Sequence, residues 1–284
     1  MRHRQDIELI NISRGPDRYP DPVGYSYLDL DLLDHFKVQQ FITDYRPDCI
    51  IHTAAMTNVD ACEDQPEACK QLNVDVVANL CALCEKWNIH FIHLSTDFIF
   101  DGLNGPYREE DKPNPLSTYG QSKMESEHVV SASDCPWTII RTIIVYGVVA
   151  DMSRTNIVLW AKSALEKGEA LNVVNDQWRM PTLAEDLATA CIASAMKGQT
   201  GVYHVSGAEH FSIKELVEEV ADFWKLDASL IRSISSSTLS QKAPRPARTG
   251  FILDKARRDL DYQPTPFRKG LALVELQLHG KSLG

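Results

Sequence analysis

CIIHTA (residues 49–54), ACKQLNVDVVANLCALCEKW (residues 68–87) and HFIHLS (residues 90–95) follow one another along the chain as an apolar run, a long helical pattern and a second apolar run. Short runs that are apolar throughout are typical of strands buried on both faces of a parallel sheet. A strand, a crossover helix and a second strand predict neighbouring parallel strands joined by a right-handed connection.

The same alternation continues on both sides of this stretch. IELINIS (residues 7–13) and WTIIRT (residues 137–142) have the composition of further strands, and residues 35–45 and 117–130 have helical patterns. Strands that alternate with helices predict an α/β fold with a doubly wound, Rossmann-like parallel sheet covered by helices on both faces.

After Tyr146 the pattern loosens, and we expect a smaller C-terminal lobe over the carboxyl ends of the strands, where open α/β sheets bind ligands. Residues 155–167 and 183–196 have helical patterns, and GVYHVSG (residues 201–207) predicts a strand.

The C-terminal segment carries one clear helix start. Ser212 and Glu215 form a capping box that predicts a helix ending near Trp224. SISSST (residues 233–238) and KAPRPAR (residues 242–248) predict an exposed loop.

Composition excludes several classes of function. The 284 residues carry 29 Lys and Arg against 39 Asp and Glu, a net charge of −10, which argues against general nucleic-acid binding. No apolar stretch reaches the ~20 residues of a membrane helix, and the first ten residues lack the apolar region of a secretory signal. We expect neither a nucleic acid nor a membrane as partner.

The seven cysteines are scattered and odd in number, which suits a reducing cytoplasm. Cys81 and Cys84 form a CxxC pair inside a helical run. We expect buried thiols there and no metal site, because one such pair without nearby His residues is a weak metal signal.

YGQSK (residues 119–123) is the most informative chemical motif. Tyr119 and Lys123 lie one turn apart on the predicted helix, and a nearby ammonium lowers the pKa of a phenol. Such a Tyr can give a proton to a carbonyl oxygen. A surface Tyr and Lys is the alternative, because this spacing also arises by chance.

Two other segments follow predicted strands. Ser95, Thr96 and Asp97 come at the end of HFIHLS, where a hydroxyl can bond a substrate carbonyl, or can satisfy only local backbone groups. HTAAMTNVDACE (residues 52–63) begins with small residues that let a cofactor approach the backbone, or that simply make a tight turn.

In this order the motifs resemble the extended short-chain dehydrogenase/reductases and, within them, the dTDP-4-dehydrorhamnose reductase family. The resemblance covers nearly the whole chain, and its elements are ISRG, DLLD, RPD, HTAAMTNVD, QLNV, LSTDFIFDG, PYREED, PLSTYGQSK, RTIIVYG, NDQWRMPT and RPAR. The methionine adenosyltransferase beta subunit is similar to the same reductases and serves as a partner protein.

The resemblance implies a catalytic set. Tyr119 would be the general acid, Lys123 would hold the nicotinamide ribose, and Thr96 would orient the substrate carbonyl with help from Asp97. The residues that the resemblance assigns to the cofactor, besides Tyr119 and Lys123, are Ser13, Arg14, Asp31, Leu32, Ala54, Ala55, Met56 and Asn73.

The first strand ends in Ser13 and Arg14 with no carboxylate, which favours NADPH, with NADH possible, because Arg accommodates the additional phosphate of NADP. The alternative is that Arg14 is a solvated loop residue. The substrate would be a nucleotide sugar, and its diphosphate needs cationic donors such as Arg. The residues that the resemblance assigns to the substrate are Thr57, Asn156, Trp178, Arg179, Pro181, Arg245 and Arg248.

The implied domains are a cofactor-binding core (residues 1–150, with 183–206 returning to it) and a substrate-binding lobe (residues 151–182 and 207–284). The chain departs from the family pattern at its start, where the first strand, the glycine-rich turn and its helix are missing, and residues 1–4 align with the end of that helix. Either the protein begins upstream, which we favour, or full cofactor binding has been lost.

Three functions follow from the resemblance. The first is NADPH-dependent reduction of the 4-keto group of a dTDP-linked 6-deoxysugar, which gives dTDP-rhamnose. The second is a non-catalytic regulatory subunit, and the third is a reductase or epimerase for another nucleotide sugar. The resemblance also implies a homodimer.

Overall fold

A four-stranded parallel sheet forms the centre of the computed structural model, which describes residues 6–19, 23–149, 155–239 and 241–280. Its order is β10 (Gly201–Val205), β5 (Trp137–Thr142), β4 (His90–Thr96) and β3 (Cys49–His52). Each neighbouring pair is parallel, and His52 pairs with His93 across β3 and β4. The prediction of an α/β fold with a parallel sheet is confirmed.

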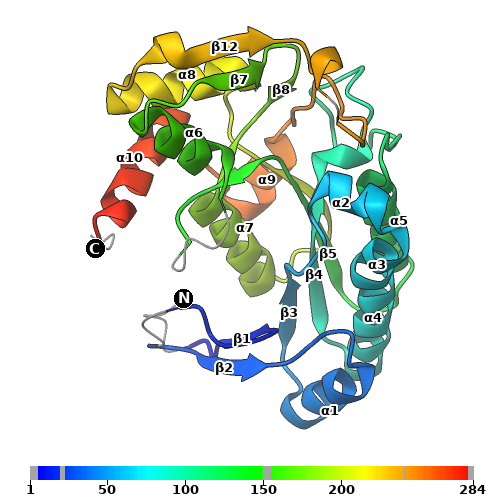
Figure 1. Ribbon diagram of the computed structural model, residues 1–284. Coiled ribbons are helices and arrows are strands. Elements are labelled where there is room, and N and C mark those ends of the chain that lie inside the picture. The colour runs from blue at the N-terminus through cyan, green and yellow to red at the C-terminus, as the bar shows by residue number, and fades with distance from the viewer. Residues whose placement is uncertain (1–5, 20–22, 150–154, 240, 281–284) are drawn as a thin grey trace.

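Helices cover both faces of this sheet (Figure 1). On one face lie α1 (His35–Tyr45), α4 (Val76–Trp87) and α5 (Thr118–Ser131), whose apolar side chains pack with Phe91 and Ile139 of the sheet. On the other face, α7 (Ala184–Lys197) and α9 (Asp254–Leu260) pack against Ile92 and Ile140. Residues 91 and 92 therefore point to opposite faces, as the two-residue period of a strand requires.

Two more strands form a separate pair near the sheet. β1 (Ile10–Ser13) and β2 (Ser26–Asp29) are parallel to each other and lie beside β3 in Figure 1. Among the described residues, β3 forms sheet hydrogen bonds with β4 alone. Its residues Ile50 and Ile51 are half-buried. The predicted strand over residues 7–13 begins later, at Ile10, and residues 1–4 lie outside the described ranges.

A second core joins the C-terminal elements. It is built from α6 (Ile157–Glu166), β7 (Leu171–Val174), α8 (Ile213–Trp224), β12 (Ile231–Ile234) and α10 (Phe267–Leu278). The capping box of Ser212 and Glu215 at the start of α8 is confirmed. The prediction of a loop over residues 233–238 is wrong, because Ser233 and Ile234 end β12 and pair with β7, and a short 3₁₀ helix (Ser236–Thr238) follows.

The predicted single helix over residues 68–87 is interrupted. α2 (Val59–Asp64) is followed by α3 (Pro66–Lys70), a π-helical turn (Gln71–Asp75) and then α4. Pro66 is the first residue of α3, a position that tolerates proline because its missing amide would have no helical partner. π turns are frequent at functional sites, and this one contains the buried Asn73.

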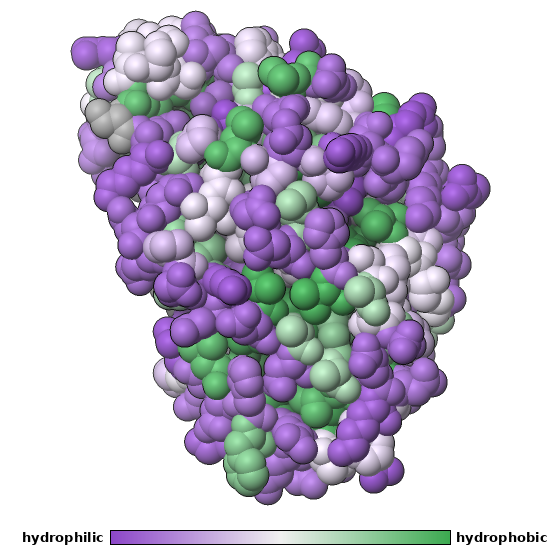
Figure 2. All heavy atoms as spheres, turned by 90° about the vertical axis from the view of Figure 1, so that its right-hand side faces the viewer, coloured by the Kyte–Doolittle hydropathy of each residue, from purple (hydrophilic) through white to green (hydrophobic). Residues whose placement is uncertain are grey.

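Short elements complete the chain. They are the 3₁₀ helices Asp97–Ile99 and Ala228–Leu230, and the two-residue strands β6 (Val145–Tyr146), β8 (Trp178–Arg179), β9 (Thr182–Leu183) and β11 (Phe211–Ser212). Within the described ranges, no helix is long and apolar enough to cross a membrane. The face on which α3, α4 and α5 lie is largely hydrophilic, with separate apolar patches (Figure 2).

Candidate active site

The structure brings Thr96, Tyr119 and Lys123 together at the carboxyl end of β4. Thr96 is the last residue of β4, and Tyr119 and Lys123 lie in the first turns of α5. The Thr96 side chain is near enough to Tyr119 to lower the pKa of the phenol. All three residues are buried, with 7%, 8% and 3% of their surfaces exposed, so their side chains are shielded from bulk water.

The start of α5 is fixed by contacts that hold Tyr119 beside this strand end. Ser117 caps the helix by accepting a hydrogen bond from the Gly120 amide, and the Glu63 carboxylate accepts from the amide and hydroxyl of Thr118 at 2.7 and 2.6 Å. A Cβ on Gly120 would lie 2.3 Å from the Phe98 carbonyl oxygen. Only glycine therefore lets the helix approach the strand end this closely.

Lys123 is bound by the sheet beneath it. Its Nζ atom lies 3.0 Å from Nε2 of His93, a residue of β4 that has no exposed surface. Burial lowers the pKa of Lys123 to about 8, and Glu127 acts in the opposite direction. The ammonium is therefore positive at neutral pH and loses its charge a little above it.

The sequence-based prediction that the pKa of Tyr119 is lowered is wrong for this structure. Burial raises the pKa of the phenol, and the neighbouring Thr96 side chain offsets this only in part. The Lys123 ammonium is directed to His93. Tyr119 is consequently a protonated donor at neutral pH.

Asp97 is buried at the site and linked to the C-terminal part of the chain. Its carboxylate accepts a hydrogen bond from Thr249 at 2.5 Å and from Thr96 at 3.2 Å, and lies 3.6 Å from Nε of Arg179. Burial raises the pKa of Asp97, and the Arg179 charge opposes that rise. Asp97 thus connects the predicted catalytic strand end to the segment around Thr249.

The segment predicted to line the cofactor follows β3 and is partly exposed to solvent. We call residues 54–57 the shelf. Ala54 and Thr57 are exposed, while Ala55 and Met56 are half-buried. Asn73 is 1% exposed, and its side chain is bonded to the backbone of Met56 in this segment. Its Oδ1 accepts a hydrogen bond from the Met56 amide at 2.8 Å, and its Nδ2 donates one to the Met56 carbonyl at 3.1 Å. Asn73 therefore acts on the shape of the shelf, since both ends of its amide are occupied.

The other predicted cofactor residues gather at the carboxyl ends of β1 and β2. Ser13 bonds to the Tyr27 hydroxyl at 2.8 Å, and the exposed Arg14 guanidinium lies 3.8 Å from Asp31. Leu32 is half-buried beside Asp31. These residues form a polar edge with one accessible cation, Arg14, whose side chain is 79% exposed.

The loop containing Arg245 and Arg248 is attached to α2. Arg245 forms an ion pair with Asp60 at 2.7 Å, and Lys242 forms one with Asp64 at 2.6 Å. Arg248 is exposed, and its guanidinium lies 5.8 Å from the centre of the Trp178 ring. The structure therefore joins Lys242 and Arg245 to α2, while Arg248 lies against Trp178.

Three residues predicted to bind the substrate are instead hydrogen-bonded to, or buried by, other parts of the chain. Arg179 is 2% exposed and donates to the carbonyls of Trp178 and Pro246, both at 2.7 Å. Asn156 caps α6 with its oxygen and donates its amide to the Gly147 carbonyl. Pro181 is buried, and its carbonyl accepts from the amide of Gly207.

Sequence reasoning missed several residues that build the site: His93, Asp60, Glu63 and Thr249. Asp60 and Glu63 lie within the quoted motif HTAAMTNVDACE and His93 within HFIHLS, but nothing in these letters indicates their partners. The predicted buried thiols Cys81 and Cys84 are confirmed. In the described part of the chain, no group of three His, Cys, Asp or Glu residues could hold a metal.

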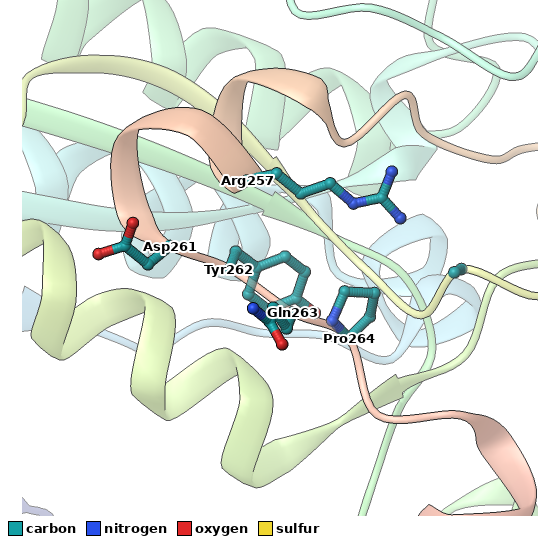
Figure 3. Close-up of a pocket in the computed structure, with 6 residues that line it drawn as sticks. Arg257, Asp261, Tyr262, Gln263 and Pro264 are labelled. Atoms are coloured by element: carbon teal, nitrogen blue, oxygen red, sulfur yellow. The ribbon is translucent and has the colours of Figure 1, made fainter.

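A separate hollow of about 390 Å³ lies elsewhere on the surface (Figure 3). It is lined by Ala208, Arg257, Asp261, Tyr262, Gln263 and Pro264, from α9 and neighbouring loops. None of these residues belongs to the sequence-predicted site. The hollow is therefore distinct from the strand-end arrangement of Thr96, Tyr119 and Lys123.

A parallel sheet of this kind, with Thr, Tyr and Lys at the carboxyl end of one strand, defines a protein of the short-chain dehydrogenase/reductase class. The sequence model of the RmlD substrate binding domain family matches residues 3–278. The chain belongs to this family.

Known relatives differ in what they do. Methionine adenosyltransferase 2 subunit beta from Bos taurus is 34% identical over 250 residues, covering 85% of this chain and 74% of that protein. The probable low-salt glycan biosynthesis reductase Agl14 from Haloferax volcanii is 32% identical over 248 residues, covering 87% and 83%. A dTDP-4-dehydrorhamnose reductase from Bacillus anthracis, solved in complex with NADP, is 25% identical with a TM-score of 0.82, covering 91% of this chain and 92% of that one.

Proposed function

We propose that this protein reduces the 4-keto group of a dTDP-linked 6-deoxysugar with NADPH, in the manner of a dTDP-4-dehydrorhamnose reductase. The observation that carries the proposal is the meeting of Thr96, Tyr119 and Lys123 at one strand end. The solved reductase with NADP supports the reaction class and the cofactor.

The residues at the strand ends fit the nicotinamide half of such a cofactor. Ala54 and Thr57 leave an open shelf, and the nearby Ser95 hydroxyl is buried without a protein partner among the described residues. Lys123 would bind the ribose hydroxyls. Arg14 would meet the additional phosphate of NADPH, and NADH remains an alternative. When bound, the nicotinamide supplies the hydride.

Proton delivery falls to the chain itself. Tyr119 keeps its proton at neutral pH because burial raises its pKa, and it would donate that proton from its hydroxyl to the keto oxygen. Thr96 lies beside this hydroxyl and would orient the same keto oxygen. Asp97 would hold Thr96 in place through their 3.2 Å contact.

The substrate would lie between the strand ends and the C-terminal segments. We assign cofactor binding to residues 1–150 with 183–206, and substrate binding to residues 151–182 and 207–284. The cations available for a diphosphate are Arg245, on release from Asp60, and Arg248. Trp178, which faces Arg248, would stack on a base or sugar. The substrate region would be supported, without direct contact to the substrate, by Arg179, Asn156 and Pro181.

The test is NADPH binding by this 284-residue chain, followed by turnover of dTDP-4-dehydrorhamnose measured as loss of NADPH absorbance. NADH is the cofactor comparison, and the same keto sugar linked to UDP is the substrate comparison. Turnover with the dTDP sugar that is lost in Tyr119→Phe supports the proposal. Tight NADPH binding with turnover of only the UDP sugar would instead indicate a reductase or epimerase for another nucleotide sugar.

A non-catalytic regulatory subunit is the second candidate, favoured by the 34% identity to methionine adenosyltransferase 2 subunit beta. In that case the chain would co-purify with a methionine adenosyltransferase catalytic subunit and change its activity, and Tyr119→Phe would leave this effect intact. For either function we propose a cytoplasmic location. The homodimer also remains a prediction, and sedimentation of the purified chain tests it.

A further inference from the structure

Lys123 has an unusual environment for a buried lysine. No carboxylate lies within ion-pair distance of its Nζ atom in the part of the chain that the structure describes. Its hydrogen-bond partner is Nε2 of His93 at 3.0 Å. His93 is three residues before Thr96 on β4 and is completely buried. The proposed function uses Lys123 but has no part for His93.

A charged Lys123 selects one tautomer of His93. An ammonium only donates hydrogen bonds, so Nε2 must offer its lone pair to Lys123 and the ring proton must be on Nδ1. The Ser126 hydroxyl lies 2.9 Å from the same Nε2 and donates to the Lys123 carbonyl at 2.7 Å, so it does not compete for the lone pair. Nδ1 is buried without a partner among the described residues.

The surroundings keep the imidazole neutral. Burial lowers the pKa of His93, and the charge of Lys123 lowers it further. The His52 ring stacks on the His93 ring with centres 5.6 Å apart. A neutral ring is required for the contact, because protonation of Nε2 would remove the acceptor that Lys123 uses.

We propose that His93 is a positioning residue for Lys123: its neutral imidazole accepts a hydrogen bond from the buried ammonium, fixes its direction and preserves its charge at neutral pH. The inference rests on the proposed function, in which Lys123 binds the cofactor ribose. His93 itself touches neither cofactor nor substrate.

The other ionisable groups around Lys123 do not replace this acceptor. Cys69 of α3 also raises the pKa of Lys123, and Tyr119 of α5 lies beside Thr96. Glu127 also raises that pKa, but its carboxylate is engaged by Arg141 at 2.7 Å. His52, the remaining neighbour, is neutral, since burial lowers its pKa to about 3.

Three variants separate the hydrogen bond from the packing of the strand. His93→Leu removes the acceptor, and His93→Gln restores one at a similar reach. His90→Leu is the matched control. His90 lies on the same strand, and its replacement also removes a hydrogen bond of Nε2, the one to Thr138 at 2.8 Å. This bond does not involve Lys123.

The pKa of Lys123, followed through its ¹³Cε chemical shift, is the first readout, and it does not depend on catalysis. We expect a fall of about one to two pH units in His93→Leu, the effect of losing one hydrogen bond to a charged group. His93→Gln and His90→Leu should remain near the wild-type value of about 8. The alkaline limb of NADPH affinity should move with the pKa of Lys123.

A ¹⁵N spectrum of the histidine-labelled wild-type protein tests the tautomer without any variant, and so remains decisive if His93→Leu does not fold. A proton on Nε2 of His93, or an unchanged Lys123 pKa in His93→Leu, would overturn the inference. The Lys123 pKa and the His93 tautomer can both agree with the inference while the wild type neither binds NADPH nor turns over substrate. In that case the proposed function fails, and the His93–Lys123 contact has a structural role only.

Discussion

Replacing Lys123 with methionine should stabilise the fold while it destroys the proposed activity. The folded chain releases the Lys123 proton near pH 8, whereas the unfolded lysine does so near its ordinary pKa of 10.5. The folded state therefore carries the cost of a buried charge in full below pH 8. That cost disappears as the pH rises toward 10.5, because the lysine is then neutral in both states.

The magnitude follows from the two pKa values. A difference of about 2.5 units corresponds to about 3 kcal/mol at pH 7 and to about 1 kcal/mol at pH 9.5. The stability of Lys123→Met relative to the wild type should therefore fall by about 2 kcal/mol between these two pH values. The lost hydrogen bond to His93 changes the absolute difference but not its dependence on pH.

Urea denaturation of both proteins at a series of pH values measures this quantity. Lys269→Met, at an exposed position of α10, is the control for loss of a positive charge alone. A stability difference that stays constant from pH 7 to pH 9.5 would refute the reasoning, because it would mean that burial does not perturb Lys123. NADPH affinity should fall sharply in Lys123→Met, since the ribose partner is gone.

Four further variants test the site. Tyr119→Phe should lower turnover by about 10²-fold or more with little change in NADPH affinity, because only the proton donor is lost, and stopped-flow loss of NADPH measures it. Asn73→Ala leaves the backbone of Met56 without two hydrogen bonds. It should lower the free energy of unfolding in urea by about 1–3 kcal/mol and raise the Kd for NADPH. An unchanged Kd would show that Asn73 does not shape the cofactor-binding segment. Arg245→Gln should raise the KM for the nucleotide sugar about tenfold. Asp60→Asn removes the same ion pair without removing the cation, so an equal rise in KM would show that the pair is only structural.

Local patterns were sufficient for much of the fold. Residues 49–52 and 90–96 form the expected parallel strands because short runs that are apolar throughout are typical of a sheet covered on both sides. The Ser212 and Glu215 capping box gave the correct start of α8, since both of its hydrogen bonds join residues three apart. The π turn around Asn73 carried no comparable signal, because its letters also suit an α-helix.

The predicted site was resolved only in part. Tyr119 and Lys123 could be placed together because residues four apart share a helix face, and Thr96 could be placed at a strand end. Arg179 and Asn156 were assigned to the substrate, yet one is bonded to the carbonyls of Trp178 and Pro246 and the other caps α6. A side chain's letter gives its donors and acceptors but not which of them the fold has already occupied.

The sequence by itself determined the alternation of strands and helices, the face shared by Tyr119 and Lys123, and the family to which the chain belongs. Only the tertiary structure decided the electrostatics of the site. Arg245 meets Asp60 across 185 residues of chain and Thr249 meets Asp97 across 152, while Lys123 reaches His93 from another element. Charge and pKa depend on distance and burial in space, and contacts so remote along the chain leave no periodic pattern in the sequence.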